Sequence, residues 1–160
     1  MQKAELLIRM IEEAFSGVVL GDGVGLWQAQ GLDDYCDEKQ CMALREKDEK
    51  LDWRKISKED INRCYSSLSF FDAAGMRFHL PAYMILDIEG GYDYDLDLNL
   101  TDINDYKEQQ FSLLNQEQRQ AVRSYLSYRL DQFYQEFDKS GFEDFSLHNI
   151  ERALAGYWQK

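Results

Sequence analysis

The chain has 160 residues, of which 44% are hydrophobic and 14% aromatic, so it has enough apolar side chains for a single folded domain over residues 1–160 and is not an intrinsically disordered polypeptide. Thirty acidic and eighteen basic residues give a formal net charge of −12, which argues against nucleic-acid binding, because that binding relies on Lys and Arg. No stretch approaches the roughly 18 apolar residues of a membrane span, and the charged N-terminus lacks the apolar centre of a secretory signal, so we expect a cytoplasmic protein without membrane contact.

Helical periodicity predicts three helices in the first half of the chain. Apolar residues recur at helical spacing over 2–15, and a second helical region covers 26–47. A third helix over 57–66 opens on a capping serine that is followed three residues later by aspartate. Four glycines lie between the first two helices, at 17–25, and no Lys follows them as it would in a phosphate-binding loop. We therefore expect an ordinary loop there.

The middle of the chain departs from helical periodicity. Asp72 to Gly75 has the composition of a tight turn between aromatic and apolar residues, which predicts a short β hairpin. Pro81 suits the first turn of a helix, so we expect a short buried helix over 82–88. Acidic or polar residues alternate with apolar ones over 92–100, which is the period of an extended strand with one acidic face.

The last third of the chain predicts two further helices. Asn115 caps a long helix over 116–137, with Gln118 at the reciprocal capping position, and Ser146 caps a final helix over 147–158. Together these elements predict a mainly α, compact domain of about five to six helices, with room for one small β hairpin or strand.

The cysteines point to a reducing compartment. Cys36, Cys41 and Cys64 are odd in number and have no framework spacing, which does not suit a disulfide scaffold. Structural zinc sites usually show paired Cys or His spacing, and the only histidines here are His79 and His148. We therefore predict no zinc site and no cofactor.

Three alternating carboxylates raise the question of calcium. Asp93, Asp95 and Asp97 match the beginning of an EF-hand loop, which then requires Gly at its sixth position and Glu at its twelfth. Those positions hold Leu98 and Asn104, so the pattern fails. A metal site is not predicted.

One central block carries a resemblance to a known family. The segment F-F-D-A-A-G-M-R-F-H-L-P-A-Y-M at 70–84, a D-D-Y at 33–35, a W-x-x-I-S at 53–57 and an L-x-x-E-Q-R-x-A-V helix at 114–122 resemble an uncharacterised family of small bacterial proteins, a domain of unknown function. His79 stands where that family more usually has Tyr. The resemblance implies a bacterial cytoplasmic protein and brings no catalytic residues.

The sequence favours a binding protein over an enzyme. Small size, strong negative charge and the lack of a catalytic motif suggest a protein that inhibits or neutralises a basic protein partner, as an immunity protein does for a toxin. Residues 87–105 contain seven acidic residues and no basic one, and Tyr is a common interface anchor. The predicted partner-binding residues are Asp87, Asp93, Asp95, Asp97, Tyr92, Tyr94, Asp102 and Asp105. The oligomeric state stays open.

An enzymatic alternative rests on a different group of residues. Asp72, Arg77 and His79 are close in sequence, and a carboxylate that orients a histidine is part of many general-base arrangements. With the carboxylates of 93–97 they suggest a metal-dependent hydrolase, which requires all of them to converge in one pocket. The simpler structural reading pairs Arg77 with Asp72 across the predicted turn beside a packed His79. No nucleophile motif is present, so no catalytic residue is predicted.

Overall fold

The computed structural model describes residues 2–160, and within them it contains ten α-helices, two short 3₁₀ turns and no strand. This confirms the mainly α class, although the helices are more numerous than the five to six predicted. The helices are α1 (Gln2–Ala14), α2 (Leu26–Asp33), α3 (Glu38–Lys47), α4 (Lys58–Arg63), α5 (Ser67–Phe70), α6 (Ala73–Ile88), α7 (Leu96–Thr101), α8 (Asp105–Gln110), α9 (Gln116–Ser140) and α10 (Phe145–Ala155), with 3₁₀ turns at Trp53–Lys55 and Tyr157–Gln159.

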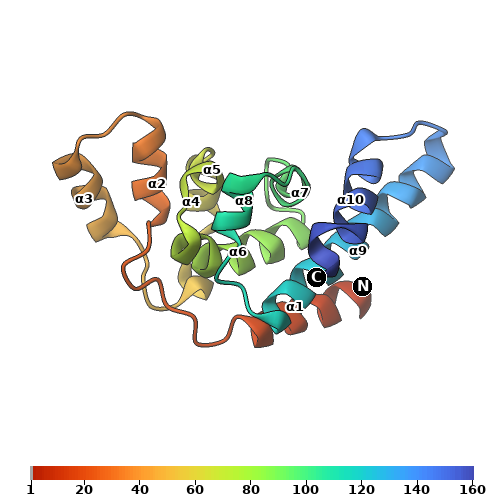
Figure 1. The fold of residues 1–160 in the computed structure, drawn as a ribbon, viewed down its shortest axis with the longest axis horizontal. Coiled ribbons are helices and arrows are strands. Elements are labelled where there is room, and N and C mark those ends of the chain that lie inside the picture. Colours follow the sequence, from red (N-terminus) through yellow and green to blue (C-terminus); the bar gives the residue numbers. More distant parts are fainter. Residues whose placement is uncertain (1) are drawn as a thin grey trace.

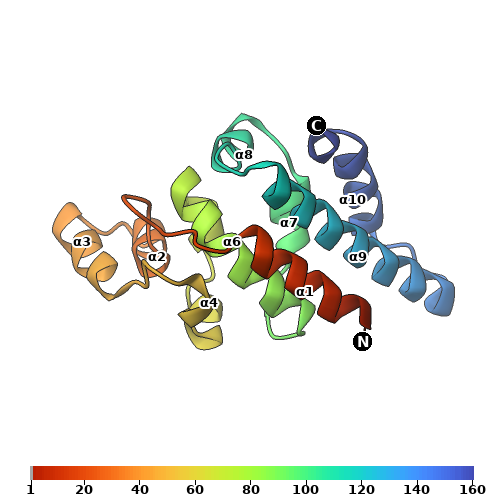
Figure 2. The same cartoon turned by 90° about the horizontal axis from the view of Figure 1, so that it is seen from below.

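The helices are arranged along one long axis (Figure 1). The α2–α3 hairpin projects at one end, and the α9–α10 hairpin projects at the other. Helices α4 to α8 lie between the two hairpins, and α1 packs against both α9 and α6, as the turned view in Figure 2 shows. No helix within residues 2–160 has the length and apolar character needed to cross a membrane.

Helix α6 runs through the middle of the molecule, where a hairpin and a separate short helix were predicted. The hairpin prediction is wrong, because Asp72 is the N-cap of a helix: its Oδ1 accepts hydrogen bonds from the backbone N–H of Gly75 at 2.8 Å and of Val24 at 3.0 Å. The helix predicted over 82–88 is present, but it is the second half of the continuous α6 and not a separate short helix. A Cβ added at Gly75 would lie 2.5 Å from the carbonyl oxygen of Val24, so this glycine permits a close approach of two backbones. Pro81 lies inside α6 and is buried.

Helix α7 replaces the strand predicted over 92–100. The alternating pattern still buries Leu96 and Leu100, because residues four apart share one face of a helix. The carbonyl of Leu100 accepts a 2.7 Å hydrogen bond from the buried indole N–H of Trp158, which docks the C-terminal turn on α7. The strand prediction is therefore wrong, since no neighbouring strand exists among residues 2–160 for pairing.

The long C-terminal helix is confirmed. Asn115 caps α9 together with Gln118 in a reciprocal capping box, as predicted. Helix α10 begins slightly earlier than expected, since Asp144 rather than Ser146 is its N-cap. The buried apolar side chains form one connected core, whose largest fully buried members are Trp158, Tyr83, Tyr125, Phe15, Phe71, Phe78 and Phe111.

The helical region predicted over 26–47 is broken into α2 and α3. The backbone of Tyr35 is left-handed, with φ of 61°, and the N–H of Cys36 donates to the carbonyl of Gly31 at 2.9 Å. This hydrogen bond closes α2, and Asp37 then caps α3 through the backbone N–H of Gln40.

Replacing Tyr35 with glycine is expected to raise the free energy of unfolding by up to about 1 kcal/mol, because the left-handed conformation is unfavourable for residues that carry a Cβ. The Tyr35 side chain is 95% exposed, so its removal takes away little packing. Urea denaturation of the two proteins measures the difference. Tyr35→Ala is the control, because it removes the ring and keeps the Cβ. A Gly variant that is no more stable than the Ala variant would show that the turn is not strained.

Candidate functional site

The eight predicted partner-binding residues fall into two groups. Three turn inward from the end of α6 and the start of α7, namely Asp87, Tyr92 and Asp97. Five are exposed in the loops around α7 and at the start of α8, namely Asp93, Tyr94, Asp95, Asp102 and Asp105. The two groups therefore have different chemical environments and different possible roles.

The inward carboxylates meet an arginine from the long helix α9. Arg129 Nε lies 3.6 Å from Asp87 Oδ2, and Arg129 Nη2 lies 3.7 Å from Asp97 Oδ1. The hydroxyl of Tyr125 donates a 2.5 Å hydrogen bond to Asp87 Oδ2. We call Asp87, Asp97, Tyr125 and Arg129 the inner cluster. The inner cluster joins α6, α7 and α9. Its two carboxylates contact Arg129 and Tyr125 of the same chain, so they do not face a partner.

The inner cluster is poorly hydrated. The side chain of Asp97 is only 3% exposed. Burial raises the pKa of Asp97, and the positive charge of Arg129 opposes this increase without cancelling it. Burial also raises the pKa of the Tyr125 hydroxyl, as does the neighbouring Asp87 carboxylate. Arg129 therefore compensates a carboxylate that would otherwise be buried alone.

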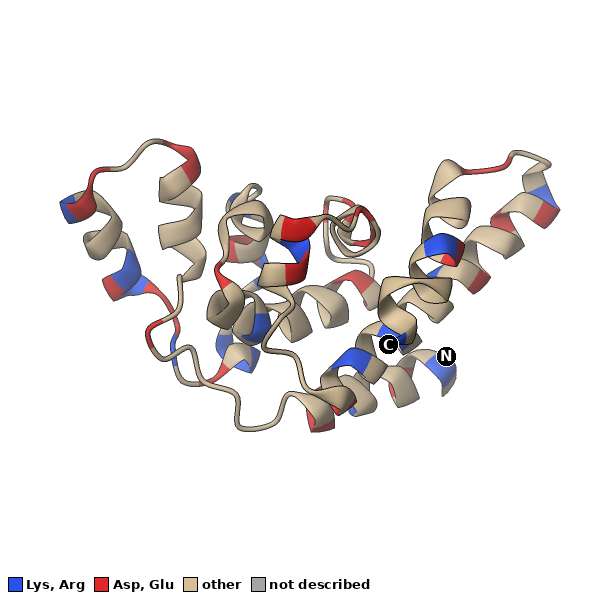
Figure 3. Ribbon diagram, viewed as in Figure 1, with Lys and Arg blue, Asp and Glu red and all other residues tan. Residues whose placement is uncertain are grey.

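The exposed group forms the candidate binding site, which we call the acidic surface. Close to these carboxylates in the sequence are three exposed large side chains, Tyr94, Leu98 and Tyr106, which are 49%, 46% and 49% exposed. Figure 3 shows the acidic residues along the loops around α7 and on α8. The acidic surface consists of Asp93, Tyr94, Asp95, Leu98, Asp102, Asp105 and Tyr106.

The loop that begins the acidic surface is fixed to α4. The side-chain amide of Asn62 donates to the carbonyl of Gly91 at 2.9 Å, and its oxygen accepts the backbone N–H of Asp93 at 2.9 Å. A Cβ at Gly91 would lie 2.7 Å from a methyl carbon of Leu86, so the loop also packs closely on α6.

Helix α8 is also firmly attached to its neighbours. The buried amide of Gln110 donates to the carbonyls of Leu68 at 3.0 Å and Phe71 at 2.8 Å. Tyr106 donates to the carbonyl of Ser69 at 2.5 Å, and Lys107 Nζ lies 3.2 Å from Asn99 Oδ1 on α7. The acidic surface is thus preorganised, which reduces the entropy lost when a partner binds.

The residues of the enzymatic alternative are not brought together. Asp72 caps the first turn of α6, while the carboxylates of 93–97 follow the other end of this 16-residue helix. At 1.5 Å per residue the helix is about 24 Å long. No ion pair joins Arg77 to Asp72, so that predicted pairing is wrong. Among residues 2–160 there is no group of three His, Cys, Asp or Glu that could hold a metal ion.

His79 lines a small cavity of about 230 Å³, whose lining also includes the carboxylates of Asp48, Glu49 and Asp60. Its Nδ1 lies 2.7 Å from the carbonyl of Gly75, and its ring stacks on Phe71 with 4.3 Å between centroids. Burial lowers the pKa of His79 to about 4, so the ring is neutral near pH 7. Ser57, the one hydroxyl-bearing residue of the cavity lining, accepts the backbone N–H of Asp60 as a helix cap. His79 is therefore a packed core residue.

The sequence did not indicate a role for Arg129 or Asn62, and it placed Tyr125 on the apolar stripe of the long helix without its contact to Asp87. A signal for Arg129 is present, since it is a single charged residue within the apolar stripe of α9, between Leu126 and Phe133. Such a position often requires a buried carboxylate partner. Which carboxylate it meets depends on contacts between distant segments.

The fold and site define an all-α protein with exposed carboxylates in the loops around α7 and at the start of α8. The chain belongs to a family of unknown function, DUF6714, whose model matches residues 2–160. No curated protein and no solved structure matches it.

Proposed function

We propose that this protein is a bacterial cytoplasmic binding protein that inhibits or neutralises a basic protein partner through the acidic surface. The observation that carries the proposal is the combination of four exposed carboxylates with three exposed apolar or aromatic side chains on a hydrogen-bonded scaffold. Aromatic side chains supply contact area, and complementary charge speeds the encounter of two proteins.

Inhibition would follow from competition for a basic site. A protein that acts on nucleic acid holds phosphates with Lys and Arg, and a surface with Asp93, Asp95, Asp102 and Asp105 presents negative charge to the same residues. Because Asp87 and Asp97 face Arg129, we omit them from the proposed contact.

The test begins with isolation of the partner from a bacterial lysate at low and high salt, followed by mass spectrometry. Binding of the purified partner is then measured with a variant in which the four exposed carboxylates are changed to amides: D93N, D95N, D102N and D105N. We expect the association rate at low salt to fall at least about tenfold, and the dependence on salt to weaken.

A matched control carries the same change of charge elsewhere. The exposed glutamates of α1 and the start of α9 provide it, as the variant E5Q, E12Q, E13Q and E117Q. If both variants lose affinity equally, the binding reflects the net charge of −12 and not the acidic surface. A partner that is acidic, or that binds equally well at high salt, would contradict the proposal.

A further inference from the structure

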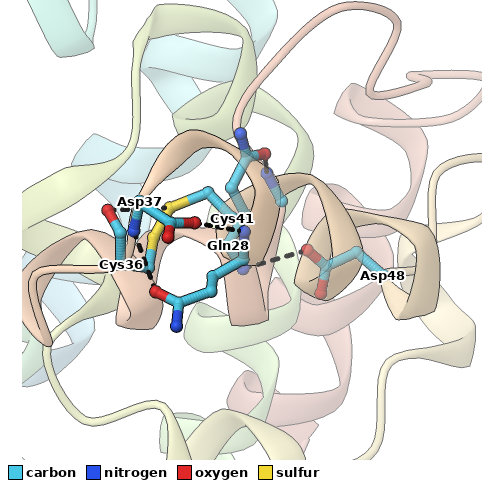
Figure 4. The surroundings of a disulfide bond; sticks show 7 residues. Gln28, Cys36, Asp37, Cys41 and Asp48 are labelled. Atoms are coloured by element: carbon cyan, nitrogen blue, oxygen red, sulfur yellow. Dashed lines mark hydrogen bonds between the residues drawn. A yellow bond between two sulfur atoms is a disulfide. The ribbon is translucent and has the colours of Figure 1, made fainter.

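The turn between α2 and α3 contains a disulfide that the sequence did not predict. Cys36 follows α2, Cys41 lies in α3, and the two are joined with their Cα atoms 5.6 Å apart, a usual distance for a disulfide. Figure 4 shows the bond beside Asp37 at the start of α3. The sequence spacing of the two cysteines gave no signal for this bond, because only the turn between the helices brings them together.

We propose that Cys36 and Cys41 form a reversible redox-modification site, at which thiol–disulfide exchange with a dithiol releases the N-terminal end of α3. A disulfide of this kind suits the proposed cytoplasmic location only if it can be reduced and formed again, since thiols there are kept reduced. The site is separate from the acidic surface, and its test does not depend on the proposed function.

The exposure of the two residues indicates which sulfur reacts. Cys36 is partly exposed, whereas Cys41 is 6% exposed, so an incoming thiolate reaches the Cys36 sulfur first. It forms a mixed disulfide with Cys36, and Cys41 leaves as a thiolate that takes up a proton. The second thiol of the dithiol then attacks the mixed disulfide and releases Cys36. The protein gains two electrons and two protons, and the dithiol becomes a cyclic disulfide.

The charge around the turn affects which reductant reacts, because carboxylates outnumber the one cation between the cysteines, Lys39. Four carboxylates flank the cysteines in sequence, and they would repel an anionic thiol such as glutathione and disfavour its thiolate near Cys36. An uncharged or basic dithiol does not meet this repulsion. The four carboxylates are Asp33, Asp34, Asp37 and Glu38.

The third cysteine does not compete in this exchange. Cys64 is buried, and burial raises the pKa of its thiol to about 12. Because the thiolate is the reactive form, Cys64 stays inert in the folded protein. Redox chemistry under native conditions is therefore confined to one pair.

The effect of reduction is local, because the two ends of α3 are attached differently. The disulfide ties the N-terminal end to the end of α2. At the other end, the guanidinium of Arg45 donates to the carbonyls of Gly21 at 2.6 Å and Gly23 at 3.3 Å. Asp48 accepts the backbone N–H groups of Trp27 at 2.7 Å and Gln28 at 3.2 Å. These contacts remain after reduction.

Hydrogen exchange of the full chain, with and without the neutral dithiol dithiothreitol, tests the proposal. Reduction should accelerate exchange of the backbone amides of Cys36, Gln40 and Cys41 at least about tenfold, because each belongs to the turn that the disulfide closes. The amides of Trp27 and Gln28 should change by less than about twofold, since Asp48 still holds them.

Alkylation and a redox-insensitive variant complete the test. Iodoacetamide should label no cysteine of the oxidised native protein and two after reduction, and dithiothreitol should act faster than glutathione at equal thiol concentration. The C36S and C41S double variant should show the exchange pattern of the reduced protein with or without dithiol. Failure of an uncharged disulfide such as hydroxyethyl disulfide to restore the bond, or identical exchange in both states, would overturn the proposal.

Discussion

Replacing Arg129 with methionine is expected to lower the free energy of unfolding by about 3 kcal/mol at neutral pH, because it leaves a buried carboxylate without its compensating charge. Arg129 is the ion-pair partner of both Asp87 and Asp97, and the Asp97 side chain is almost completely buried. Methionine retains much of the packing of the arginine alkyl chain, so the decrease in the free energy of unfolding arises mainly from the missing positive charge.

The dependence of this loss on pH identifies its cause. Burial raises the folded-state pKa of Asp97, and removal of Arg129 raises it further, because the arginine was lowering it. A carboxyl group with a raised folded-state pKa stabilises the fold while protonated, and this contribution is lost as the pH rises through that pKa. The difference between wild type and R129M should therefore be largest near pH 7 and shrink as the pH falls.

A double-mutant cycle separates the ion pair from packing. Asp97→Asn in the R129M background removes the uncompensated charge, so it should recover part of the lost stability, whereas the same change in the wild type should be destabilising. Arg123→Met is the control on the same helix, since Arg123 makes no ion pair within residues 2–160. Urea denaturation at several pH values measures the free energy of unfolding of the wild type, R129M, D97N, the double variant and R123M. Equal losses for R129M and R123M would mean that the inner cluster contributes nothing.

The sequence predicted the fold where local signals agreed with tertiary packing. Helix α9 has a capping box and a long apolar stripe, so its start was correct to the residue. The sequence predicted only a turn at Asp72, although an aspartate is equally suited to the helix N-cap that it forms in the structure. The choice depends on Val24, which is 48 residues away and contributes a second hydrogen bond to Asp72.

The candidate site was only partly predictable for a similar reason. Acidic composition marked the segment 87–105 as the candidate contact surface, which stays a prediction, but alternation could not decide which carboxylates face solvent. Which carboxylates face inward depends on Arg129 and Tyr125 of α9, which contact Asp87 and Asp97, and Tyr125 is 38 residues away from Asp87 in the sequence. A strand register would have placed Asp93, Asp95 and Asp97 on one face, whereas the helix separates Asp97 from the others.

Acid should destabilise the protein through His79. Burial lowers the folded-state pKa of this histidine from 6.5 to about 4, so the folded protein binds its proton less tightly than the unfolded chain does. Above the unfolded-state pKa, the neutral His79 does not change the free energy of unfolding with pH. As the pH falls from 6.5 to 4, the unfolded chain binds the proton first, so the free energy of unfolding decreases progressively. The full shift of the His79 pKa corresponds to a decrease of about 3 kcal/mol in the free energy of unfolding.

Phenylalanine at position 79 is the variant that isolates this effect. It preserves an aromatic ring to stack on Phe71 and cannot take up a proton, although it loses the contact of His79 Nδ1 with Gly75. H79F should therefore be less stable than the wild type near pH 7 by about 1 kcal/mol, the usual contribution of one hydrogen bond, and more stable near pH 4.

The crossing of the two stability curves is the decisive observation, because other groups also titrate over this range. The buried carboxyls of Asp48 and Asp97 have raised pKa values and act in the opposite direction to His79, but they are common to both proteins and cancel in the difference. Urea denaturation between pH 6.5 and 4 gives that difference, and the ring resonances of His79 report its protonation directly. Parallel curves would show that His79 is hydrated in solution and that the small cavity beside it admits water to its free Nε2 atom.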